Sequence, residues 1–316
     1  MRGTEAPRPG ARVDLRSPRG YYVDLSRSAD PGGPTDAAGL PLARGPGAEE
    51  THSPVDVARF GLGNLEIYLR NGNGSRRERF EAAVRWLVEN AEEIPGGFVG
   101  WPMPGVPAAY RASLASGWFS GAAHGACLSV LARASALLGL EGALETAARA
   151  VGGFTTPVED GGFMREVGEG GHEGGLDSMM MIEEYPMAAR PSVTLTGHVV
   201  ALWGLFDYAN VSGEVDAEVA FDRGVRGLAF ELHRYDLGYW TRHDLDEHWR
   251  GIKLADLSAI VLQTLGLRVL AAMTTRQEFS DTADRWAAYA SGHGNRWRAR
   301  AAGVRFGLLN PGSRAL

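Results

Sequence analysis

The stretch from Phe119 to Leu138 constrains the fold more than any other, because its residues are almost all apolar and span about five turns of helix. A helix that is apolar on every side is stable in water only when other elements cover all of its sides. The chain offers further segments whose apolar residues recur at helical spacing: 57–71, 80–88, 144–151, 193–208, 216–233, 254–273 and 279–306. We therefore expect about eight helices around an apolar core.

Short turns and long glycine-rich loops join these segments alternately, and there is little strand pattern. The sequence predicts a mainly α fold, and the alternation of apolar and amphipathic helices favours an α/α toroid, an incomplete α/α barrel with its long loops at one mouth. Ser75 and Glu78 predict a capping box at the start of one helix. The loop from Gly152 to Pro191 is unusually long and contains the run Met179 to Met181, which would suit a flexible apolar wall.

The first 53 residues differ from the rest in being rich in Pro, Gly, Arg and Asp, with one strand-like apolar patch from Tyr21 to Leu25. We expect residues 1–53 to form a loop-rich segment docked on the main domain, and residues 54–316 to form the toroid.

Charge and composition narrow the choice of partners. A net charge of −6 gives no broad basic field, so we expect neither nucleic acid nor membrane as a partner. No run reaches about 18 apolar residues, and the N-terminus lacks a signal-peptide pattern, so a cytoplasmic protein is expected. The single cysteine, Cys127, is expected to be a buried thiol.

Two groups of residues offer metal ligands, His172 with Glu173 and Asp177, and His243 with His248. Neither group has a recognised ligand spacing. We expect no metal and no cofactor.

The run Glu183-Glu184-Tyr185-Pro186 lies just before an apolar helix and places a carboxylate beside a phenol. These groups can serve as general base and general acid for moving a proton at carbon. Two less specific interpretations stay open: Tyr185 as a wall residue with a hydrogen-bonded hydroxyl, and Glu183 as a solvated loop charge.

Between Tyr21 and Leu308 the chain resembles the C-terminal catalytic domain of the D-glucuronyl 5-epimerase family. The order and spacing of several runs carry the resemblance: Gly117-Trp118-Phe119-Ser120-Gly121, His124-Gly125, Asp160-Gly161-Gly162, Glu183 to Pro186, Ser192 to Gly197, Ala201 to Tyr208, and Tyr235 to Trp240. The resemblance implies that Tyr185 is a catalytic tyrosine with Glu184 as its carboxylate neighbour. It also implies an isomerase that moves the proton on carbon 5 of a uronate, next to a carboxylate that must be neutralised.

Several positions depart from the family pattern. His243 stands where the family has a tyrosine, Leu257 where it has another, His124 in place of a glutamine and Thr196 in place of an asparagine. Because histidine can carry protons near neutrality, we predict His243 or His124 as the second proton carrier. A surface salt-bridged His243 and a core His124 are the less specific alternatives.

The predicted substrate-binding residues are those near these runs that offer charge, hydrogen bonds or aromatic faces: Arg190, Trp118, Thr196, Tyr239, Trp240 and Arg242. Arg190 could pair with a substrate carboxylate or could only hold Glu183 or Glu184.

Three functions remain open at this point. The first is an epimerase acting on a uronate-containing saccharide, and the second is a cyclase, lyase or isomerase acting on a small, secondary metabolite in the same pocket. The third is an inactive saccharide-binding relative, because exchanged polar residues on a retained scaffold fit either a changed reaction or a lost one. A homodimer is considered for each.

Overall fold

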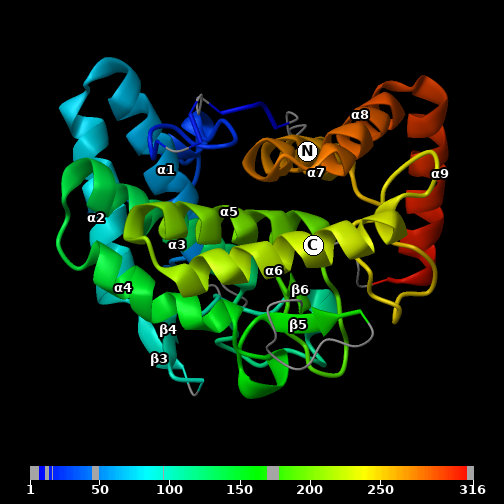
Figure 1. The fold of residues 1–316 in the computed structure, drawn as a ribbon, viewed down its shortest axis with the longest axis horizontal. Coiled ribbons are helices and arrows are strands. Elements are labelled where there is room, and N and C mark those ends of the chain that lie inside the picture. The colour runs from blue at the N-terminus through cyan, green and yellow to red at the C-terminus, as the bar shows by residue number, and fades with distance from the viewer. Residues whose placement is uncertain are drawn as a thin grey trace.

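The computed structural model describes residues 7–10, 14–15, 17–44, 50–94, 96–168 and 178–311. Nine α-helices lie in this part of the chain: α1 Pro54–Asn71, α2 Gly74–Glu89, α3 Gly121–Leu138, α4 Ala143–Ala150, α5 Leu195–Ser212, α6 Val215–Tyr235, α7 Leu257–Thr274, α8 Gln277–Ser291 and α9 His293–Leu309. The prediction of a mainly α fold is confirmed. In Figure 1, α1 and α2 lie at one end and α7, α8 and α9 at the other, with α5 and α6 running side by side between them.

The described strands form three antiparallel pairs: β1 Ala43–Arg44 with β2 Glu50–Thr51, β3 Glu92–Ile94 with β4 Phe98–Gly100, and β5 Met164–Val167 with β6 Met179–Ile182. The β5–β6 hairpin lies inside the stretch predicted as a long loop, in register from Met164 opposite Ile182 to Val167 opposite Met179. Met180 and Met181 are fully buried in β6. They pack in the core and do not form a flexible wall.

Helix α3 is the centre of the core, as its sequence predicts, and every residue from Gly121 to Ala134 is buried. It packs most extensively against α5, and also against α1 and α4. Glycines allow the backbones of α3 and α5 to touch: a Cβ on Gly204 would lie 2.2 Å from the carbonyl oxygen of Gly125. The small residues of these runs therefore set the distance between the two central helices.

Two local predictions were wrong. Helix α2 is capped by Asn73, whose side chain accepts a hydrogen bond from the Ser75 backbone N–H at 3.0 Å, and not by a capping box at Ser75. The segment predicted as one helix over 279–306 is two helices, α8 and α9, which meet at Gly292. Glycine is a poor helix former, so it marks the break.

The described part of the N-terminal segment contacts the central helices. Tyr21 and Tyr22 are buried, and Tyr22 packs against Trp203 of α5 with ring centroids 4.9 Å apart. The Tyr22 hydroxyl donates to Asp207 at 2.8 Å, and Asp207 is ion-paired with Arg133 of α3. A buried polar cluster therefore joins the segment to α3 and α5.

Helices α3 and α7 are both long and apolar enough to span a membrane by length and composition alone, so the expectation that no segment would qualify is wrong at that level. In α3, 78% of the apolar window is buried inside the protein, as in a core helix, whereas in α7 the buried share is 33%.

Candidate functional site

A cleft of about 1110 Å³ opens between the N-terminal segment, the first turns of α1, α3 and α5, and the loop from Met103 to Trp118. We call this feature the cleft throughout. Its described lining includes these titratable, hydroxyl or indole side chains: Tyr21, Asp24, Ser28, Ser53, Asp56, Arg59, Arg111, Trp118, Ser120, Glu184, Tyr185, Thr196 and Trp203. Of the sequence-predicted residues, Glu184, Tyr185, Trp118 and Thr196 therefore lie in one cavity.

Glu184 enters the cleft from the loop between β6 and α5. Its carboxylate accepts a hydrogen bond from the hydroxyl of Thr194, which is the N-cap residue of α5. Gly197 leaves room for this arrangement, since a Cβ there would lie 2.7 Å from Glu184 Oε2. Burial raises the pKa of Glu184, while Thr194, Arg59 and Lys253 oppose the rise. A carboxylate with a raised pKa is a stronger base than an exposed one.

Tyr185 lies between two aromatic side chains of the Met103 to Trp118 loop. Its ring centroid is 4.7 Å from that of Tyr110 and 5.4 Å from that of Trp118. Burial, followed by the negative charge of Glu184, raises the pKa of Tyr185 well above its ordinary value. Its hydroxyl therefore stays protonated near neutral pH and can donate a proton.

Two arginines that were not predicted from the sequence also line the cleft. They are Arg59 on α1 and Arg111, which follows the short helix Ala108–Tyr110. Both are exposed, and neither forms an ion pair with a residue in the described ranges. Arg59 is close enough to favour the charged form of Glu184. The one sequence signal for Arg59 as a cleft residue is its place on the face of α1 opposite the apolar stripe.

Lys253 is a further missed residue, close to Glu184 but outside the cleft lining. Its Nζ lies 3.7 Å from Asp244 Oδ2 and 5.2 Å from the centre of the Trp249 ring, without a hydrogen-bond partner among the described residues. Burial lowers the pKa of Lys253 and raises that of Asp244 to about 6. The ammonium group favours the ionised form of both carboxylates near it.

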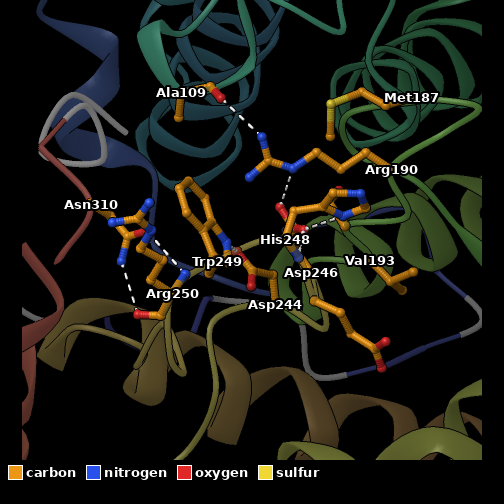
Figure 2. A network of polar contacts seen from close by, with 12 residues as sticks. Ala109, Met187, Arg190, Val193, Asp244, Asp246, His248, Trp249, Arg250 and Asn310 are labelled. Carbon is orange, nitrogen blue, oxygen red and sulfur yellow. Dashed lines mark hydrogen bonds and ion pairs between the residues drawn. The ribbon is translucent and has the colours of Figure 1, made fainter.

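Arg190 belongs to the network shown in Figure 2 and does not line the cleft. Its Nε donates to Asp246 at 2.7 Å and another nitrogen donates to the Ala109 carbonyl at 3.1 Å. The guanidinium also lies 4.6 Å from the centre of the Trp249 ring. Arg190 is thus paired with Asp246, and not with Glu183 or Glu184.

The two histidines predicted as proton carriers lie outside the cleft lining. His124 is fully buried among aromatic rings, with Phe163 at 4.5 Å and Nδ1 at 3.1 Å from the Ser120 carbonyl, and burial lowers its pKa to about 4. His243 is half-buried, and burial together with the charge of Lys253 lowers its pKa to about 3. Both rings are therefore neutral near pH 7.

Three predicted binding residues, Tyr239, Trp240 and Arg242, also lie outside the cleft lining. The indole of Trp240 is buried and donates to the Ala255 carbonyl at 2.7 Å, and Tyr239 lies beneath the guanidinium of Arg298 at 3.7 Å. Arg242 pairs through its backbone N–H with Tyr235. Their predicted role in binding stays a prediction.

Glu183 is fully buried and ion-paired with Arg165 at 2.8 Å, so its interpretation as a solvated loop charge was wrong. A loop position suggested exposure, but the hairpin turns this side chain inward.

No cluster of three or more potential metal ligands occurs among the described residues. His172, Glu173 and Asp177 lie outside them.

Comparison with known proteins places residues 98–288 within the family model described as the D-glucuronyl C5-epimerase C-terminus. The chain is 30% identical over 245 residues to a D-glucuronyl C5-epimerase of Caenorhabditis elegans, covering 72% of this chain and 38% of the relative. It is also 28% identical over 137 residues to an uncharacterized protein of Methanocaldococcus jannaschii, covering 43% of this chain and 42% of that protein. The chain thus spans less than half the length of each of these relatives.

A solved structure described as a UGL variant with dGlcA-Glc-Rha-Glc shares the fold. The TM-score is 0.51 at 14% sequence identity, over 74% of this chain and 61% of the other.

Proposed function

Because the chain belongs to the D-glucuronyl C5-epimerase C-terminal family, we propose that it is an isomerase-type acid–base enzyme that moves a proton at a carbon next to a carboxylate or carbonyl. Epimerisation at carbon 5 of a uronate is the most specific form of the proposal. The observation that carries it is the pair Glu184 and Tyr185, which face one cleft with pKa values raised by burial.

The proposed chemistry follows from the charges in the cleft. Glu184 takes the proton from carbon, and the electrons of the broken C–H bond pass into the adjacent carboxylate or carbonyl of the substrate. Arg59 neutralises the charge that develops there. Tyr185 donates a proton to form the new C–H bond when the substrate presents its other face.

If the substrate does not turn over, base and acid must act on its opposite faces, and this needs a proton carrier besides the adjacent pair Glu184 and Tyr185. Tyr21 is the other tyrosine among the described lining residues, and burial raises its pKa to about 12. It enters from the N-terminal segment, outside the stretch that the family model matches. Tyr21 is therefore a better placed candidate than His124 or His243, which do not line the cleft.

The proposed substrate is a uronate-containing saccharide. A cleft of about 1110 Å³ slightly exceeds the range of roughly 300–1,000 Å³ that suits single small ligands. Trp118 and Tyr185 offer ring faces against which sugars can stack. Cyclisation or elimination of a small metabolite is less favoured, because Met180 and Met181, which were expected to offer a flexible apolar wall, pack in the core.

We also propose that the helices form an incomplete α/α toroid. Supporting this are the successive contacts of α1 with α2 and α3, of α3 with α5, of α5 with α6 and α7, and of α7 with α8. The cleft would then lie at the mouth where the loops gather.

The experiment that tests the function is incubation of the protein with uronate-containing polysaccharide in deuterated water, followed by NMR detection of deuterium at carbon 5. Exchange is expected with the wild type and is expected to fall at least about 10²-fold in Glu184→Gln and Tyr185→Phe. Glu278→Gln and Tyr289→Phe, both on α8 and absent from the cleft lining, serve as matched controls. If a well-folded wild type shows no exchange, the epimerase proposal is wrong, and a binding relative becomes the better interpretation.

A further inference from the structure

The backbone at Val193 adopts a conformation that its side chain disfavours. Its φ is +37°, and only one other non-glycine residue in the described ranges has a positive φ. A β-branched residue in this region is strained by about 1–3 kcal/mol and persists only where its surroundings hold it. The position is notable because Val193 lies two residues before α5 and one before Thr194.

Glu183 accepts most of the hydrogen bonds that hold this strained turn in place. Its buried carboxylate accepts hydrogen bonds from the Val193 N–H at 2.8 Å and the Ser192 hydroxyl at 2.9 Å, and it is paired with Arg165 Nε at 2.8 Å. Arg165 also donates to the Met187 carbonyl at 3.1 Å, and the buried Tyr235 hydroxyl donates to the Val193 carbonyl at 2.7 Å. We call Glu183, Arg165, Ser192 and Val193 the Glu183 brace.

The brace ends next to the residue that contacts the base. Thr194 follows Val193 directly, is fully buried, and donates its hydroxyl to Glu184 Oε2. Thr194 Oγ1 and Glu184 Oε2 are both within 2.7 Å of the place where a Cβ on Gly197 would lie, so little free space surrounds the pair. A shift of the 192–194 backbone would therefore move the Thr194 hydroxyl away from the carboxylate.

We infer that Glu183 is a positioning residue: by holding the strained Val193 turn, it fixes the Thr194 hydroxyl on Glu184 and so sets the proton affinity and orientation of the base. This inference deepens the proposed function and rests on it for its catalytic meaning. It assigns the two neighbouring glutamates different tasks, Glu184 toward the substrate and Glu183 toward the scaffold.

The test is an NMR titration of the Glu184 carboxyl carbon in protein labelled with ¹³C-glutamate, with Glu184→Gln used to identify the resonance. The Thr194 hydrogen bond lowers the pKa of Glu184. Thr194→Val should therefore raise the titration midpoint. Glu183→Gln should raise it as well, because the released turn withdraws the same hydroxyl.

The sign of the shift separates positioning from simple charge. If Glu183 acted on Glu184 only through its charge, removal of that charge would lower the pKa of Glu184, since like charges disfavour ionisation. A lowered or unchanged midpoint in a folded Glu183→Gln protein would overturn the inference. The rise should also disappear when Glu183→Gln is made in a Thr194→Val background, and a rise that persists there would overturn the inference too.

Glu166→Gln is the matched control, because Glu166 lies on the same hairpin and is also paired with an arginine, Arg223, at 3.3 Å. It should leave the midpoint of Glu184 unchanged. If Glu183→Gln does not fold, Ser192→Ala removes only the 2.9 Å bond and should raise the midpoint by a smaller amount. No rise in Ser192→Ala would then count against the brace.

The titration needs no substrate, so its outcome is independent of the deuterium exchange that tests the function. Where exchange is measurable, Glu183→Gln should slow it by about 10²-fold, as expected for a displaced catalytic group. Glu166→Gln should not slow it.

Discussion

Asp207 and Glu184 are two carboxylates withdrawn from solvent in one fold, and they differ in how completely they are satisfied. Asp207 receives two nitrogens of Arg133, the Ser129 hydroxyl at 2.7 Å and the Tyr22 hydroxyl at 2.8 Å. Glu184 accepts hydrogen bonds from two hydroxyls, those of Thr194 and Tyr185, and no cation among the described residues is hydrogen-bonded to it. A saturated cluster holds a structure together, whereas a carboxylate with spare acceptor capacity can still take a proton.

The largest expected effect comes from breaking the saturated cluster. Asp207→Ala leaves the fully buried Arg133 without its counter-charge, which should cost about 3–5 kcal/mol in the free energy of unfolding. Urea unfolding monitored by circular dichroism measures this. Glu184→Gln is the comparison and should change the free energy of unfolding by less than about 1 kcal/mol. Equal losses for the two variants would contradict the contrast between the clusters.

A second expected effect concerns His124, which neither belongs to the Asp207 cluster nor lines the cleft. Its folded pKa of about 4 lies below the ordinary value of 6.5, so the unfolded chain binds a proton that the folded state refuses between these values. The neutral ring therefore contributes fully to the free energy of unfolding above pH 6.5. This contribution, about 3 kcal/mol in total, is lost as the pH falls toward 4.

His124→Leu should therefore reduce the loss of stability between pH 7 and pH 4.5, as measured by urea unfolding at both values. His198, whose pKa burial also lowers to about 4, keeps the rest of the dependence. An unchanged dependence in His124→Leu would mean that the ring is not held neutral by burial.

Two glycines on α5 allow the same comparison with one kind of substitution. Gly204→Ala puts a methyl group against the α3 backbone and should destabilise the protein by about 1–3 kcal/mol in urea unfolding. Gly197→Ala puts the methyl group against Glu184 and Thr194 and should slow deuterium exchange by about 10²-fold. If Gly197→Ala lowers only stability and leaves exchange intact, Glu184 is not the base.

The smallest expected effect is electrostatic. Arg59 favours the charged form of Glu184, so Arg59→Gln should move the acidic limb of the pH–rate profile to higher pH. Because Arg59 is exposed, the displacement should shrink as salt is added. Arg111→Gln changes the charge of the same cleft, but Arg111 is not among the main influences on the pKa of Glu184, so this variant should leave the limb in place. Equal displacement by both variants would mean that only the net charge of the cleft matters.

The features that local sequence determines were predictable. The apolar run of α3 and the Glu184-Tyr185 pair could be read directly, because helical periodicity and adjacent residues leave a local pattern. Break points were less certain, since a single glycine at Gly292 divides a segment whose apolar pattern continues across it.

Residues that tertiary packing brings together left no such pattern. Arg59 comes from α1 and Lys253 from the loop before α7, and each reaches Glu184 only through the packing of α1, α5 and α7. His124 drew attention by its chemistry and its alignment, yet its helix face turns it toward Phe163 and away from the cleft lining. Residue type indicates what a side chain can do, but burial and direction decide whether it meets a substrate.

One wall of the cleft consists of Tyr21, Val23, Asp24 and Leu25, and the intervening Tyr22 is anchored to Asp207 in the core. Ligand binding and local unfolding of this segment therefore exclude each other, because detachment of residues 21–25 from α5 would remove one wall of the cleft. A saccharide that occupies the cleft should slow amide hydrogen exchange at Tyr22, a residue absent from the cleft lining, in proportion to its affinity. The occupancy of the cleft would then be visible in the amide protection of Tyr22.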